Sequence, residues 1–183
     1  NAEKKGVVGM SNIGNTCYGN SVLQAMRHQI DFTIFLLQGQ HEALKRRTNE
    51  KTRVLDAYAQ LVRTMWASEG AEANTRDFWG AMLPAAIQAG FEQFRIPVPH
   101  DAHEFLCFLL DAFHEALAEE VSMTIKTTST NPDVRGGLEF WKTSFQKSYS
   151  PLVELVFGIQ RKCVKCEDCG HESISWESMN MTK

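Results

Sequence analysis

The sequence predicts an α+β fold in which a mainly helical N-terminal part is followed by a short strand-rich part. Two segments, 53–67 and 101–121, repeat apolar residues at intervals of three and four, which is the spacing of an amphipathic helix. After residue 158 the pattern changes to two strand-like segments that flank a tight turn around Glu167 and Asp168. The chain has 183 residues with 43% hydrophobic and 22% charged content, which is typical of a globular domain or a lobe of a larger one.

The first predicted helix begins at Cys17. Residues 6–16 are rich in glycine and asparagine and end in Thr16, a good N-cap residue. An apolar-periodic run follows, made of Val22, Leu23, Ala25, Met26 and Ile30. The sequence therefore predicts a turn that delivers a cysteine to the first turn of a helix.

Four further helices are predicted along the chain. The segment 53–67 is amphipathic, and Asn74-Thr75 supplies a cap for a helix that Pro84 limits or kinks. The segment 101–121 follows an extended stretch and carries the widest apolar stripe of the sequence. Ser150-Pro151 indicates an N-cap and a first-turn proline, which predict a short helix ending near residue 158.

The expected organisation has three parts. Residues 1–121 form the helical part, and 122–137 form a long loop because they contain Thr, Ser, Asn, Pro and a Gly-Gly pair. Residues 138–183 hold the short helix and the strands.

Charge and cysteine usage exclude several classes of protein. A net charge of −3 gives no basic field for nucleic acid, and no apolar stretch approaches the ~20 residues that span a bilayer. We therefore expect no nucleic acid or membrane partner. Five cysteines are an odd number, unlike the framework of a small secreted disulfide protein. This favours a reducing compartment, the cytoplasm or the nucleus.

Cys17 is the candidate nucleophile. A cysteine attacks as the thiolate, which the first turn of a helix stabilises through its free N–H groups and its dipole. Attack on a carbonyl creates an oxyanion, and Asn12 can reach back across a glycine-containing turn to donate to it. The structural alternative is that Cys17 is a small buried residue at a helix start.

Asp101 is the candidate substrate ligand. Near a helix N-terminus its carboxylate stays ionised, so it can accept hydrogen bonds from an extended peptide that carries arginines. The structural alternative is an N-cap, with Glu104 completing a capping box. One carboxylate can serve in both ways.

Two segments together resemble a known family. The stretch from Gly9, GMSNIGNTCYGNSVLQ, resembles the cysteine box of ubiquitin-specific proteases, and VPHDAHEFL resembles their QDAQEFL segment. The match departs at Met10, where leucine is usual, and at Gly19, where methionine is usual. His100 and His103 stand where the family often has glutamine.

The resemblance implies a papain-like cysteine protease fold, with residues 1–121 as a helical thumb and 138–183 as the start of the fingers and palm of an incomplete domain. It implies that Cys17 attacks the carbonyl of ubiquitin's C-terminal glycine and that Asn12 stabilises the oxyanion. The residues that the resemblance assigns to substrate contacts are Asp101, His100, His103 and Glu104. The implied function is that of a deubiquitinase, with ubiquitin or a ubiquitin-like modifier as partner.

The histidine base is not identified in this sequence. In the family it lies in a G-H-Y-like box far downstream of the cysteine, and residues 1–183 contain no such segment. We therefore expect the base in a missing C-terminal part and expect the chain alone to be inactive. His103 is more simply a residue of the groove. The alternative function is a pseudoenzyme or fragment that binds ubiquitin without turnover.

The C-terminal cysteines suggest a structural zinc site. Cys166 and Cys169 form a C-x-x-C-G knuckle that can hold one face of a tetrahedral zinc. In the family a second C-x-x-C pair lies further along, whereas Cys163 and His171 are candidates to complete the site locally. The alternative is a hairpin with free cysteines. A third interpretation of the chain is a zinc-ribbon interaction protein. No cofactor is expected for catalysis.

Overall fold

The protein folds into two compact units. A computed structural model describes residues 7–45, 48–68 and 72–180. The first unit extends from Asn1 to Leu117 and the second from Ala118 to Lys183.

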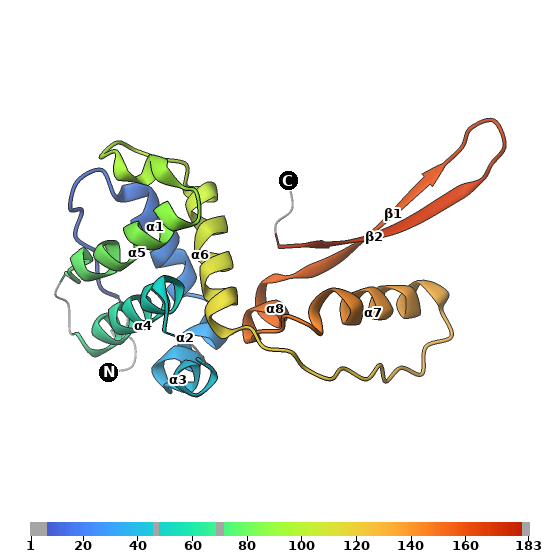
Figure 1. The fold of residues 1–183 in the computed structure, drawn as a ribbon, viewed down its shortest axis with the longest axis horizontal. Coiled ribbons are helices and arrows are strands. Elements are labelled where there is room, and N and C mark those ends of the chain that lie inside the picture. The colour runs from blue at the N-terminus through green and yellow to red at the C-terminus, as the bar shows by residue number, and fades with distance from the viewer. Residues whose placement is uncertain (1–6, 46–47, 69–71, 181–183) are drawn as a thin grey trace. The chain divides into compact units, whose positions relative to one another are not determined.

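In its described residues the first unit consists of helices, their connections and one isolated bridge between Met10 and Ala73, and its helices pack around α4 and α6 (Figure 1). α4 contacts α5 and α6, and α1 contacts both α6 and α2. The elements, in chain order, are α1 (Cys17–Arg27), α2 (Ile30–Leu37), α3 (Gln40–Leu44), α4 (Glu50–Ala67), α5 (Arg76–Gln88), the 3-10 helix η2 (Glu92–Arg95) and α6 (Ala102–Leu117).

The core of this unit is aromatic at its centre. Tyr58 of α4 is fully buried and stacks on Phe113 of α6 with ring centroids 5.2 Å apart. Phe32 of α2 packs against both rings, at 6.3 Å from Tyr58 and 5.9 Å from Phe113. Full burial of one such side chain stabilises the fold by about 1.5–3 kcal/mol. These contacts fix α6, which carries one of the predicted motifs, against the rest of the unit.

Two predicted helices are confirmed with shifted ends. α4 begins at Glu50 rather than Arg53, because the Asn49 side chain accepts from Thr52 N at 2.9 Å and Thr52 Oγ1 accepts from Asn49 N at 2.8 Å. α6 ends at Leu117 rather than at residue 121, because Glu119 leaves the helix and exchanges two backbone hydrogen bonds of 2.8 Å with Tyr149.

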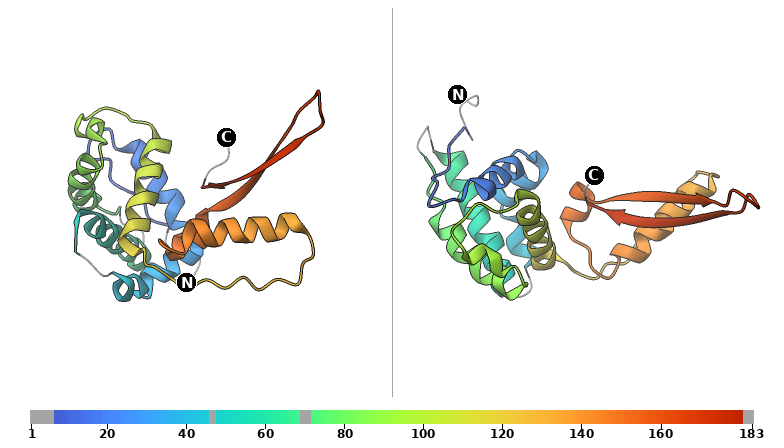
Figure 2. Two further views of the ribbon diagram at one scale, coloured as in Figure 1. Left: turned by 45° about the vertical axis from the view of Figure 1, so that its right-hand side comes forward. Right: turned by 90° about the horizontal axis from the view of Figure 1, so that it is seen from above.

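The second unit combines two helices with an antiparallel hairpin (Figures 1 and 2). The elements are α7 (Pro132–Phe145), α8 (Pro151–Val156), β1 (Gly158–Lys165) and β2 (Glu172–Met179). The register pairs Gly158 with Met179 at one end and Lys165 with Glu172 at the other. The predicted short helix, the two strands and the turn between them are confirmed.

The predicted loop of 122–137 is wrong in its last part, because α7 begins at Pro132. Asn131 caps this helix by accepting from Asp133 N at 2.8 Å. The Gly136-Gly137 pair lies inside α7 against Trp176 of β2, and a Cβ at Gly136 would meet the indole Nε1 at 3.1 Å. The glycines therefore serve close helix–strand packing and do not form a turn.

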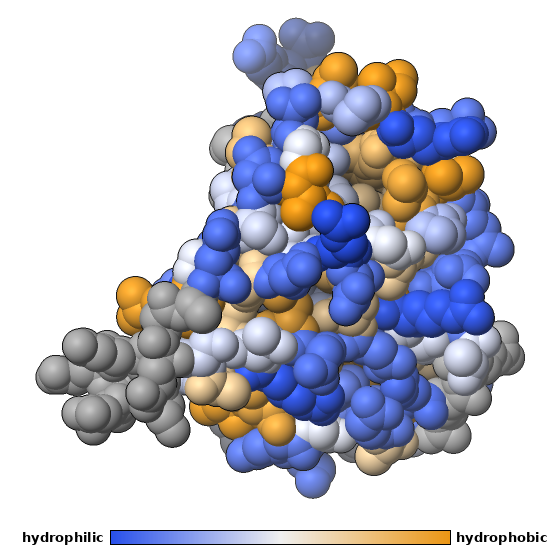
Figure 3. All heavy atoms as spheres, turned by 90° about the vertical axis from the view of Figure 1, so that its left-hand side faces the viewer, coloured by the Kyte–Doolittle hydropathy of each residue, from blue (hydrophilic) through white to orange (hydrophobic). Residues whose placement is uncertain are grey.

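Within the described ranges, none of the helices combines the length and apolar character needed to cross a bilayer. On the face drawn in Figure 3, polar side chains predominate and apolar ones form separate patches, a common property of globular proteins.

Candidate active site

Cys17 is exposed and is the first residue of α1, as predicted. The turn before it uses two left-handed residues, Gly14 with φ 122° and Asn15 with φ 52°. Glycine adopts this conformation without steric cost, and asparagine tolerates it better than most residues. The glycine and asparagine of the motif are thus required by the turn that presents the thiol.

Asn12 holds this turn closed. Its Oδ1 accepts hydrogen bonds from Thr16 N at 3.0 Å, Thr16 Oγ1 at 3.0 Å and Gly14 N at 3.3 Å. Thr16 precedes α1 but does not cap it through its own side chain, because its hydroxyl is donated to Asn12. These bonds all use Oδ1 of Asn12, so its Nδ2 group is the end that can donate to a reacting oxygen.

The segment before the turn is fastened by side chains of α1. Asn20 Nδ2 donates to Ser11 O at 3.0 Å, and Gln24 Nε2 donates to Val8 O at 3.1 Å. Ser11 N in turn donates to Ala73 O at 3.0 Å. Sequence reasoning gave no role to Asn20 and Gln24, although their spacing from Cys17 places them on one helical face.

Asp101 lies at the N-terminus of α6 and caps it. Its Oδ1 accepts from His103 N at 2.7 Å and from Glu104 N at 3.4 Å. The capping role proposed from the sequence is therefore observed. Asp101 is exposed and Glu104 is half-buried at this end of the helix.

The structure brings the cysteine box and the Asp101 segment together. Asn15 Nδ2 donates to Pro97 O at 2.8 Å, which ties the turn before Cys17 to the stretch before Asp101. The His100 ring packs edge-on against Tyr18 at 5.3 Å, and its Nε2 lies 2.9 Å from Ile96 O.

Tyr18, the residue after Cys17, is packed among aromatic rings. Its ring stacks on Phe94 at 6.0 Å and meets Phe105 edge-on at 5.5 Å. Burial, and next the charge of a thiolate at Cys17, raise the pKa of Tyr18 to about 12. Tyr18 therefore stays a neutral phenol at physiological pH beside the candidate nucleophile.

His103 does not contact Cys17 in this structure. Its Nδ1 lies 4.0 Å from the sulfur of Cys107, one helical turn further along α6. Burial, followed by the charge of Asp111, raises the pKa of the Cys107 thiol. Among the described residues, no histidine ring is hydrogen-bonded to Cys17 Sγ.

The hairpin turn brings two of the predicted metal ligands together. Cys166 N donates to His171 O at 2.8 Å, and Gly170 N donates to Cys166 O at 2.9 Å. Hydrogen bonds from Cys169 N–H, the Cys169 thiol and Asp168 N–H lower the pKa of Cys166. The backbone bonds of the turn thus place Cys166 and Cys169 near each other, as a C-x-x-C pair on one zinc requires.

Cys163 is separated from this pair. It lies within β1 opposite Ile174, and a strand rises about 3.3 Å per residue, which places it well away from Cys166. In the described part of the chain, the three cysteines do not form a group with ligand atoms within 4.8 Å of one another. We therefore remove Cys163 from the candidate zinc ligands.

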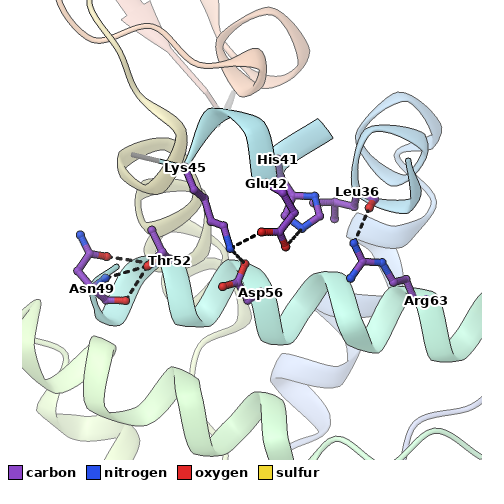
Figure 4. Close-up of polar contacts among 8 residues, drawn as sticks. All are labelled: Leu36, His41, Glu42, Lys45, Asn49, Thr52, Asp56 and Arg63. Atoms are coloured by element: carbon purple, nitrogen blue, oxygen red, sulfur yellow. Dashed lines mark hydrogen bonds and ion pairs between the residues drawn. The ribbon is translucent and has the colours of Figure 1, made fainter. Parts of the chain in front are cut away.

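A second group of metal-ligand residue types already contains a cation. His41, Glu42 and Asp56 have ligand atoms within 4.8 Å of one another. Lys45 Nζ lies 2.8 Å from Glu42 Oε2 and 2.6 Å from Asp56 Oδ1 (Figure 4). Its ammonium balances the two carboxylates, so this cluster does not support a zinc site.

Comparison with known proteins shows the family. The family model described as ubiquitin carboxyl-terminal hydrolase matches residues 8–182. The chain belongs to the ubiquitin carboxyl-terminal hydrolase family. Among its relatives in this family, ubiquitin carboxyl-terminal hydrolase 32 of Mus musculus is 32% identical over 186 residues, which cover 97% of this chain and 11% of that protein. Ubiquitin carboxyl-terminal hydrolase 4 of Pongo abelii is 30% identical over 179 residues, covering 94% and 18%.

A solved structure shows the same fold. It is the SAGA DUB module of Ubp8, Sgf11, Sus1 and Sgf73 bound to monoubiquitin, with a TM-score of 0.64 at 16% identity. The match covers 98% of this chain and 35% of that one. The expected papain-like α+β fold of part of a hydrolase catalytic domain is confirmed, and the chain spans a small fraction of its relatives in this family.

Proposed function

We propose that this chain supplies the nucleophile and part of the substrate groove of a thiol-dependent deubiquitinase, which cleaves peptide and isopeptide bonds after the C-terminal glycine of ubiquitin. The observation that carries this proposal is the exposed Cys17 at the start of α1, behind a turn held by Asn12. Membership of the hydrolase family supports it, as does the fold shared with a DUB module that binds monoubiquitin.

In the proposed reaction, the Cys17 thiolate attacks the glycine carbonyl and forms a tetrahedral oxyanion. The Cys17 backbone N–H and Asn12 Nδ2 donate to that oxygen, which develops charge only in the transition state. An imidazole has taken the proton of the Cys17 thiol and is an imidazolium at this stage. Collapse of the tetrahedral intermediate expels the lysine or peptide amine, which takes that proton, and leaves a thioester and a neutral imidazole. Water activated by the same imidazole then hydrolyses the thioester. The resemblance places this histidine downstream of residue 183.

The substrate tail is proposed to lie along the N-terminal end of α6. The Asp101 carboxylate is fixed there because it accepts hydrogen bonds from two backbone N–H groups. Its remaining lone pairs, with the half-buried Glu104, offer acceptors to arginine side chains of an extended peptide. His100 and His103 are proposed to line the same groove.

We further propose that Cys166 and Cys169 supply two of the four ligands of a structural zinc. The tight turn between the two cysteines and the donors that favour a thiolate at Cys166 support this assignment. The described residues offer no local set of four ligands at the hairpin. The resemblance assigns the other two ligands to a second C-x-x-C pair. Zinc there would hold the end of the hairpin.

The proposal is tested by covalent trapping with a ubiquitin that carries an electrophilic C-terminus. The protein is expressed from its full open reading frame and digested after reaction. Peptide mass spectrometry is expected to find ubiquitin on Cys17. Cys17→Ser should abolish the adduct, and Asp101→Asn should slow its formation about 10-fold by removing a charged hydrogen-bond acceptor. An adduct on another cysteine, or none with folded protein, would refute the proposal.

A second candidate function is ubiquitin binding without turnover. It is favoured by the observation that no described histidine is hydrogen-bonded to Cys17. This candidate predicts ubiquitin affinity that survives Cys17→Ala and falls with Asp101→Ala, together with no hydrolysis by the parent protein.

A further inference from the structure

The first turn of α1 is packed so closely that residue 19 has no room for a side chain. Gly19 is buried within α1, two residues after Cys17. A Cβ there would lie 2.4 Å from Cη2 and 2.6 Å from Cζ2 of Trp79, and 3.1 Å from Cε1 of Phe105. Carbon atoms in contact normally stay about 3.5–4.0 Å apart. Glycine is therefore required at this position by space, although it is a poor helix former.

Trp79 of α5 occupies that space, and packing alone holds it there. Its indole stacks on Phe105 of α6, with ring centroids 5.3 Å apart and planes inclined by 23°. It meets Tyr18 edge-on at 5.7 Å and Phe78 edge-on at 5.9 Å. Its Nε1 is buried and has no hydrogen-bond partner among the described residues. The ring therefore lies against both residues that follow Cys17.

The same ring connects the two motifs. Phe105 follows Asp101 by one helical turn, and its backbone N donates to Asp101 O at 3.1 Å. The resemblance to ubiquitin-specific proteases puts a methionine at the position of Gly19. In this chain the volume of such a side chain is taken by Trp79 from a different helix.

We propose that Trp79 is a positioning residue for the thiol. By filling the space above Gly19 and stacking on Phe105, it sets the spacing between the first turn of α1, with Cys17, and the first turn of α6, with Asp101. This inference rests on the proposed function, because the spacing matters when an attacking sulfur and a held substrate tail must meet. Gly19 and Trp79 are then a complementary pair, and neither tolerates a change without the other.

The inference is tested by a double-mutant cycle in the protein expressed from its full open reading frame. The readout is the rate at which Cys17 reacts with the ubiquitin electrophile, at a temperature where thermal melting shows every variant folded. Gly19→Ala is expected to slow the reaction about 10- to 100-fold, because a shift of about 1 Å in a reacting group has an effect of this size. In a Trp79→Phe background, which lacks the atoms nearest to Gly19, the same change should slow it less than about threefold.

Gly80→Ala is the matched control. Gly80 is the next residue of α5, and a Cβ there has nothing within 4 Å, so the rate should not change. The inference is overturned if Gly19→Ala reacts like the parent, or if it slows the reaction equally with Trp79 and with Phe at position 79. Should Gly19→Ala fail to fold, Gly19→Ala/Trp79→Phe must fold and react within about threefold of Trp79→Phe alone.

The test separates the two proposals. A parent protein that does not react with the ubiquitin electrophile speaks against the proposed function. In that case the cycle is measured by thermal melting, which needs no substrate. The inference then predicts that Gly19→Ala lowers the melting temperature of the parent clearly more than that of Trp79→Phe, and equal losses in the two backgrounds overturn it.

Discussion

At the scale of single residues, the candidate site is built from side chains that bond to the backbone more than to one another. Asn12, Asn15 and Asn20 each use an amide group to fix a segment beside Cys17. A buried or half-buried backbone group needs such a partner, and an amide supplies it without adding charge. The asparagines of the motif therefore have a structural role in the site, in addition to any part they take in its chemistry.

His41 is the residue whose titration should affect stability. It is fully buried, its Nδ1 has no hydrogen-bond partner among the described residues, and its Nε2 lies 3.3 Å from Glu42 Oε1, a contact that becomes an ion pair when His41 is protonated (Figure 4). Burial is the main cause that lowers its pKa, with Arg63 and Lys45 acting in the same direction and Glu42 and Asp56 opposing. The folded protein thus resists a proton that the unfolded chain takes up near pH 6.5.

Stability is therefore expected to fall as the pH drops below about 6.5, by about 1.4 kcal/mol for each unit by which folding lowers the pKa. His41→Leu should remove part of this loss of stability. The part caused by His114 should remain, because burial also lowers the pKa of His114. Urea unfolding of the parent and of His41→Leu at pH 7 and pH 5 measures the loss of unfolding free energy in each protein. Equal losses in the parent and the variant would contradict this assignment.

At the scale of helices and strands, the sequence predicted those elements whose signal is local. α4 and α6 follow from apolar spacing, and the hairpin follows from its turn. α2 was missed because its sequence, IDFTIFLL, is apolar on nearly all sides and shows no period. α7 was misjudged because its glycines pack on Trp176, a contact that only the tertiary structure reveals.

The same limit applies to the candidate site. Cys17, Asn12 and Asp101 were predicted from motifs and from the chemistry of a helix start. The contacts between the motifs could not be predicted, because they join residues far apart in the sequence. They are the hydrogen bond from Asn15 to Pro97 and the packing of Trp79 against Gly19. Cys163 lies close to the turn in the sequence, but the extended backbone of β1 carries it about 10 Å from Cys166.

The hairpin carries the prediction about metal. Protein purified with zinc and without chelator is expected to hold about one zinc per chain, when expressed from its full open reading frame. Cys166→Ser and Cys169→Ser should each release it and lower the melting temperature, because a structural zinc contributes directly to folding. Cys163→Ser is the matched control and should retain the metal. Metal analysis measures the zinc content of each variant, and thermal melting measures its melting temperature. Full zinc content in Cys166→Ser would refute the site.

At the scale of the whole molecule, two compact units carry different parts of the proposal. The first holds Cys17, Asn12 and Asp101, and the second holds Cys166 and Cys169, the proposed zinc ligands. The family match extends over residues 8–182 and thus includes both units. The chain accounts for 11% and 18% of the two hydrolases compared above, so activity is best measured on the full open reading frame.

The most direct measurement is the hydrolysis of a fluorogenic amide attached to the C-terminus of ubiquitin. The account predicts turnover by the full-length protein and a loss of about 10⁴-fold or more in Cys17→Ala, as found when a catalytic nucleophile is removed, while ubiquitin binding persists. Turnover by Cys17→Ala at the parent rate would contradict the account. A parent protein that binds ubiquitin and never cleaves it would leave the binding function in place of the enzyme.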